Sequence, residues 1–144
     1  MLDLFVLQQR IGALLDAALR GTGVRPAEYA VYSQLGIDAM TPRELTARLG
    51  VTASTLTGHL AAIERRGHLL REVDPRDRRS HRLELTGEGR RVLEVCRRRF
   101  TAAVDALYAG LAGTEIDQAR RLLVDVDRAA TQAALEIGES APAE

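Results

Sequence analysis

The chain has 144 residues, 46% of them hydrophobic, which is enough for one compact domain with its own core and excludes a disordered tail. Its 20 basic and 20 acidic residues balance, and no apolar run approaches the roughly 20 residues that a membrane span needs. The single cysteine, Cys96, excludes an internal disulfide. We therefore expect a cytoplasmic protein without a membrane partner.

A first helix of about five turns is predicted by apolar residues that lie alternately three and four positions apart. They are Leu4, Leu7, Ile11, Leu14 and Ala18. The glycines at 21 and 23 and the proline at 26 end this helix, and a second helix is predicted from Ala27 to Leu35.

The next segment has the pattern of a helix-turn-helix. Thr41 can cap a short helix that ends at Gly50, because Glu44 follows three residues later as a capping box requires. Thr52 can cap a longer helix with a core stripe on one face and small or polar residues on the other. Short hydroxyl side chains can reach base edges and phosphates. The predicted DNA contacts are Ser54, Thr55, Thr57, Gly58, His59 and Arg65.

After Gly67 the hydrophobic period changes to two, so LLREV and RLELT predict two short antiparallel strands with DPRDRRSH at their tip. The segment from Glu64 to Arg99 carries twelve Arg against seven acidic residues. A solvated charged face is one interpretation, and a wing that contacts the DNA backbone or minor groove is the other. The candidate contacts are Arg76, Arg78 and Arg79, and Asp74 and Asp77 are expected to hold the loop in shape.

Two long amphipathic helices are predicted after the hairpin. Thr86 caps the first, and Thr114, with Asp117 three residues later, caps the second. Together with the first helix they carry more apolar surface than one chain readily covers, which favours a homodimer over an intramolecular bundle. Cys96 falls within an apolar stripe and is interpreted as a packing residue rather than a redox sensor.

These features resemble the MarR family of winged-helix transcriptional regulators. The wing of that family commonly reads D-x-R-D-x-R followed by L-T-x-x-G, which this chain matches at Asp74, Arg76, Asp77, Arg79, Leu85, Thr86 and Gly89. The resemblance implies a homodimer that binds a pseudo-palindromic operator, usually as a repressor, and that a small aromatic ligand or an oxidant releases. The chain departs from the family at Gly58, where many relatives have Arg, so the operator sequence of a relative does not transfer.

The resemblance also implies a ligand cleft bordered by the first, second and fifth helices. The aromatic residues on these helices are Phe5, Tyr29, Tyr32 and Phe100, and they form either this cleft or ordinary core at the same junction.

The expected fold is therefore mainly α with a small two- or three-stranded β-wing, in a single domain of residues 1–144. Residues 26–88 form the DNA-binding lobe, and residues 1–20 and 89–138 form dimerisation helices. The expected partners are double-stranded DNA, a second copy and a small aromatic effector. The alternative is a winged-helix module that binds protein and no specific DNA.

No enzyme is expected. The three histidines lie on different predicted elements without metal-ligand spacing, and neither a glycine-rich phosphate loop nor a G-x-S-x-G turn occurs. We accordingly expect no catalytic residue, metal or cofactor.

Overall fold

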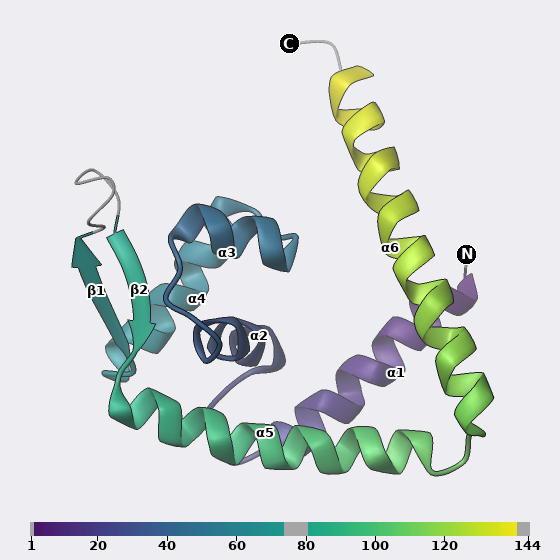
Figure 1. Ribbon diagram of the computed structural model, residues 1–144, viewed down its shortest axis with the longest axis horizontal. Coiled ribbons are helices and arrows are strands. Elements are labelled where there is room, and N and C mark those ends of the chain that lie inside the picture. Colours follow the sequence, from purple (N-terminus) through teal and green to yellow (C-terminus); the bar gives the residue numbers. More distant parts are fainter. Residues whose placement is uncertain (1, 74–80, 141–144) are drawn as a thin grey trace. The chain divides into compact units, whose positions relative to one another are not determined.

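The computed structural model describes residues 2–73 and 81–140, with side chains as far as residue 136 (Figure 1). The chain is mainly helical, as predicted, and a hairpin interrupts the helices. The elements in order are α1 (Leu2–Leu19), α2 (Pro26–Leu35), α3 (Pro42–Leu49), α4 (Ala53–Arg65), β1 (Leu69–Val73), β2 (His81–Leu85), α5 (Gly87–Tyr108) and α6 (Gly113–Ser140).

Side-chain caps set the start of three helices where the sequence predicts them. The Thr41 hydroxyl accepts the Glu44 N–H at 3.2 Å, and the Glu44 carboxylate accepts the Thr41 N–H at 2.7 Å, so the capping box is complete. Thr52 accepts the N–H of Thr55 at 3.2 Å. Thr86 accepts the N–H of Gly89 at 3.0 Å. These bonds satisfy N–H groups that the first turn of a helix leaves without partners.

The predicted start of the last helix is wrong. Helix α6 begins at Gly113, so Thr114 already lies within it. Glu115 reaches back to accept the N–H of Ala112 at 2.7 Å, whereas the prediction gave Asp117 as the capping partner. The longer glutamate side chain at the third helical position can reach the backbone that precedes the helix.

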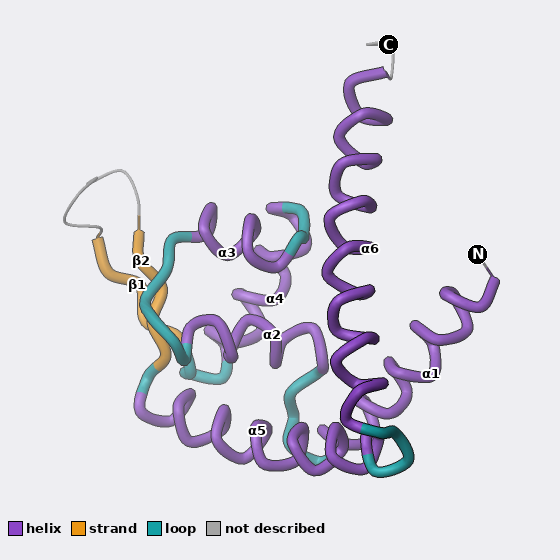
Figure 2. The backbone as a smooth tube through the Cα atoms, turned by 45° about the vertical axis from the view of Figure 1, so that its right-hand side comes forward, coloured by secondary structure: helices purple, strands orange, loops and turns teal. Residues whose placement is uncertain are grey.

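The two strands pair antiparallel from Leu69 opposite Leu85 to Val73 opposite His81. Figure 2 shows them side by side as a hairpin. Met40 exchanges two backbone hydrogen bonds with Leu83, at 2.8 and 3.1 Å. The hairpin therefore has two strands and one additional bridge from the segment before α3.

The chain divides into two compact units, Met1–Ala103 and Val104–Glu144. The first unit holds a core whose most deeply buried apolar side chains are at most 1% exposed and come from α2, α3, α4, β2 and α5. These are Val31, Tyr32, Leu35, Leu45, Leu56, Ile63, Leu83 and Cys96. In the second unit most of the described side chains are exposed, including leucines and valines of α6. Among the described residues, no helix combines the length and the apolar character needed to cross a bilayer.

Candidate nucleic-acid interface and ligand pocket

A tight turn joins α3 to α4. Gly50 follows α3 with φ of 63° and ψ of 30°, in the left-handed region, and its N–H bonds to the carbonyl of Thr46. Glycine adopts this conformation without the steric cost of a side chain, which lets the short helix stop and the next begin after residues 51–52. Helices α3 and α4 pack against each other in the arrangement of a helix-turn-helix.

Helix α4 has one buried face and one exposed face. Leu56, Leu60 and Ile63 are at most 4% exposed and belong to the core. The predicted contact residues lie on the remaining surface: Ser54, Thr55, Thr57, Gly58 and Arg65 are exposed, and His59 is partly exposed. The sequence interpretation of this helix as a core stripe with a small, polar outer face thus matches its burial pattern.

Hydrogen bonds orient two hydroxyls on the exposed face. The Thr57 hydroxyl donates to the carbonyl of Ala53 at 2.8 Å. The Thr55 and Thr52 hydroxyls lie 2.9 Å apart and share one hydrogen bond. Each hydroxyl oxygen keeps acceptor capacity, so the exposed face offers acceptors of fixed orientation.

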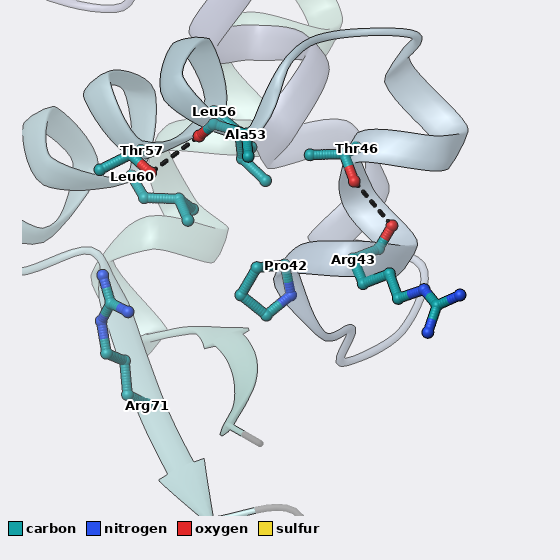
Figure 3. A pocket seen from close by; sticks show the side chains of 8 residues that line it. All are labelled: Pro42, Arg43, Thr46, Ala53, Leu56, Thr57, Leu60 and Arg71. Atoms are coloured by element: carbon teal, nitrogen blue, oxygen red, sulfur yellow. Dashed lines mark hydrogen bonds between the residues drawn. The ribbon is translucent and has the colours of Figure 1, made fainter. Parts of the chain in front are cut away.

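A cavity of about 370 Å³ lies beside α4, between α3 and β1 (Figure 3). Two arginines line it from opposite sides. Arg71 extends from β1 toward α4, where the Glu64 carboxylate accepts hydrogen bonds from its Nε at 2.8 Å and its Nη2 at 3.2 Å. Arg43 extends from α3 on the other side of the cavity. The Arg71 guanidinium lowers the pKa of the Glu64 carboxyl. The sequence interpretation did not include Arg43 or Arg71, although Arg71 lies two positions from Leu69 and from Val73 and so shares their face of the strand.

The predicted wing contacts lie outside the described residues. These are Arg76, Arg78 and Arg79, together with Asp74 and Asp77. Val73 and His81, the described residues on either side of this segment, are paired with each other at the end of the hairpin.

A buried ion pair joins α2 to the end of α4. Glu28 has no exposed surface, and its carboxylate bonds to Arg66 Nη1 at 3.0 Å and to Arg25 Nη2 at 2.9 Å. It also accepts the backbone N–H of Arg25 at 3.1 Å. Burial alone raises the pKa of Glu28, but the hydrogen bonds from Arg25 and Arg66 outweigh burial and lower it, so the carboxylate is ionised at neutral pH. The sequence interpretation did not identify this pair.

The aromatic residues predicted for a ligand cleft separate into two groups. Tyr29 and Phe100 lie together, with ring centroids 5.0 Å apart, and line a cavity of about 320 Å³. Tyr32 is 1% exposed, and its hydroxyl forms a hydrogen bond of 2.7 Å with His68 Nδ1. Burial raises the pKa of Tyr32. Phe5 is 58% exposed on α1 and does not line this cavity.

The other residues of the cavity come mostly from one face of α2. The lining consists of Leu15, Leu19, Pro26, Tyr29, Ala30, Ser33, Gln34 and Phe100. The five lining residues from α2 lie three or four positions apart along one face of the helix, so the sequence spacing around Tyr29 already indicates them. Polar groups on this mostly apolar wall come from Ser33, Gln34 and the Tyr29 phenol.

Cys96 is 1% exposed, in the core of the first unit. Burial raises the pKa of its thiol, which disfavours the reactive thiolate and agrees with the interpretation of Cys96 as a packing residue.

Comparison with known proteins identifies this architecture. A MarR family model matches residues 22–80. The HTH-type transcriptional repressor YetL of Bacillus subtilis (strain 168) is 27% identical over 129 residues, which cover 87% of this chain and 77% of YetL.

Two solved structures of regulators named CouR are similar to this chain over most of its length. CouR from Rhodococcus jostii RHA1 bound to p-coumaroyl-CoA is 30% identical, with a TM-score of 0.76 over 86% of this chain and 91% of CouR. The transcriptional repressor CouR bound to a 23-mer DNA duplex is 26% identical, with a TM-score of 0.81 over 87% of this chain and 89% of CouR. The chain belongs to the MarR family of winged-helix transcriptional regulators.

Proposed function

We propose that this regulator is a homodimeric repressor that binds a pseudo-palindromic operator and is released by a small aromatic ligand. The observation that carries the DNA-binding part is the exposed face of α4, which presents Ser54, Thr57 and other short side chains next to a tight turn and a hairpin. The similarity to a DNA-bound repressor over 87% of the chain supports this part.

In this proposal α4 lies in the major groove and the wing contacts the backbone or the minor groove. Ser54, Thr55, Thr57 and His59 supply polar contacts to base edges or phosphates, and Arg65 with the wing residues Arg76, Arg78 and Arg79 neutralises phosphates. Arg43, on the α3 side of the cavity beside α4, adds positive charge there, whereas Glu64 balances the charge of Arg71. Residues 26–88 form the DNA-binding lobe.

The dimer is formed by residues 1–20 and 89–138. Helix α1 carries Leu4 (53% exposed), Phe5 (58%) and Leu7 (48%), and α6 carries Leu122 (64%) and Leu123 (60%). A second copy of the chain can bury this apolar surface, because a two-fold dimer brings the same patch of both partners into contact. Two recognition helices then read two half-sites about one helical turn apart.

The ligand occupies the cavity beside α2. Its volume of about 320 Å³ is at the lower end of the range for small-molecule pockets, which suits a single-ring compound. The Tyr29 and Phe100 rings make stacked or edge-to-face contacts with an aromatic ligand, and the Ser33 and Gln34 side chains form hydrogen bonds with its polar substituents. Release requires that the ligand bind more tightly to a dimer whose recognition helices do not match the groove spacing.

Footprinting on the DNA upstream of the protein's own gene, with affinity measured over a range of salt concentrations, tests the DNA-binding part. We expect protection of two half-sites and a log–log salt slope of about −0.9 for each phosphate neutralised. A protein-interaction module would protect no site and show no tight binding at moderate salt. Sedimentation of the free protein gives the oligomeric state independently. Titration of salicylate into the complex up to millimolar concentration tests the ligand, and unchanged binding would contradict that part alone.

A further inference from the structure

Gly58 lies within α4, the helix Ala53–Arg65, with helical residues on both sides, and it is exposed. Glycine in the interior of an exposed helix is less favourable than alanine, because the unfolded chain loses more backbone freedom. A reason is therefore needed for the missing side chain at this position.

The fold supplies no such reason. The φ of Gly58 lies outside the left-handed region, and a Cβ built on it would meet no atom within 4 Å. Gly36 and Gly89 differ from it, since a Cβ there would lie 2.3 Å from Leu93 Cδ2 and 2.4 Å from the His68 carbonyl oxygen respectively. Alanine at position 58 would fit the chain as it stands.

The neighbours of Gly58 on the exposed face are also short. Ser54 lies four residues before it and Ala61 three residues after it, both exposed, so the three share one side of the helix. Ser54 and Thr57 extend only one atom beyond Cβ, and they reach a base edge only if the backbone of α4 lies deep in the groove. A methyl group at the centre of this face would hold the helix away.

We infer that Gly58 determines operator specificity by allowing close approach: its bare backbone lets α4 lie deep enough for the hydroxyls of Ser54 and Thr57 to reach the bases. The inference rests on the proposed function and deepens it. The DNA at this point is recognised by fit against the backbone, without a side-chain donor from position 58. The glycine favours close approach to DNA at the expense of helix stability.

The test compares the wild type with Gly58→Ala. A duplex is first selected from a random-sequence library with wild-type protein, and affinity for it and for random duplex is then measured by fluorescence anisotropy. We expect Gly58→Ala to unfold at an equal or higher urea concentration, to bind the selected duplex at least tenfold more weakly, and to bind random duplex with unchanged affinity and salt slope. Gly87→Ala is the control, because a Cβ there also meets nothing within 4 Å and the residue lies outside α4 and outside the segments assigned to the dimer.

Each other outcome identifies what fails. Equal affinity of Gly58→Ala and wild type for the selected duplex overturns the inference and leaves the proposed function intact. A loss of the same size on random duplex also overturns it, because the close approach concerns base readout. Lower stability of Gly58→Ala would show that the glycine has a role inside the fold and would overturn it as well. A wild type that selects no sequence contradicts the proposed function, and the inference with it.

Discussion

Replacing Glu28 with glutamine is expected to destabilise the DNA-binding lobe strongly. The side chain is fully buried and its carboxylate accepts hydrogen bonds from Arg25 and Arg66. Glutamine has nearly the same shape but carries no charge, and its amide places donors against the two guanidinium groups. The Arg66 side chain, 32% exposed, would lose its charged partner but keep access to water.

The magnitude follows from the burial of the pair. Removing one partner of a buried ion pair costs about 3–5 kcal/mol, and the partial exposure of Arg66 places the expected loss near the lower limit, at about 3 kcal/mol. With an unfolding entropy of about 2.1 cal/mol/K per residue over 144 residues, this loss lowers the melting temperature by about 10 °C. The comparison is made at one protomer concentration, since the stability of a dimer depends on it.

The same pair predicts a pH dependence. The pKa of Glu28 is lowered in the folded protein, so the carboxylate stabilises the fold fully above its unfolded pKa of about 4.3. This contribution is lost as the pH falls through the lower, folded pKa. The difference in unfolding free energy between wild type and Glu28→Gln should therefore be largest near neutral pH and shrink as the pH falls below about 4.

Urea unfolding followed by circular dichroism at several pH values measures both effects. Glu64→Gln is the matched control, because it makes the same chemical change in a pair with Arg71 whose side chains are 41% and 46% exposed. We expect its midpoint to stay close to that of the wild type. A Glu28→Gln protein as stable as Glu64→Gln, or a difference from wild type that does not change between pH 7 and pH 3, would refute the reasoning.

Three further changes test other parts of the molecule. Arg79→Ala should weaken binding to every duplex and make the log–log salt slope shallower by roughly one; an unchanged slope would contradict a phosphate contact by the wing. Tyr29→Ala should raise the salicylate concentration needed to release DNA, with DNA affinity preserved, and equal release would leave Tyr29 as a packing residue. Gly50→Ala should cost about 1–2 kcal/mol in urea unfolding, because φ of 63° disfavours a side chain although space is available; no loss would show that the turn relaxes.

The order of helices and the hairpin could be predicted because the signals for them are local. Thr41 and Glu44 are three residues apart, and each bonds to the other's backbone whatever the rest of the chain does. The change of hydrophobic period after Gly67 likewise marks the hairpin within a few residues. The cap predicted for α6, Thr114 with Asp117, was wrong, because the Glu115 side chain bonds to the N–H of Ala112 and the helix begins at Gly113.

The sequence also predicted the two faces of α4, because a helix of known phase separates its residues by position. It did not predict that Arg71 lies beside that helix, since Glu64 and Arg71 meet only when β1 packs against α4.

The different environments of Tyr29 and Tyr32 are determined by the tertiary structure alone. Both lie on α2, three residues apart, and both are tyrosines, so nothing in the local sequence distinguishes which of them lines a cleft. Tyr29 faces Phe100 of α5 and an open cavity, whereas Tyr32 faces the core and meets His68, 36 residues away. The burial of Glu28 against Arg66 has the same origin. Local spacing determines which residues share a helix face, but only the packing of distant segments determines which of those faces is enclosed.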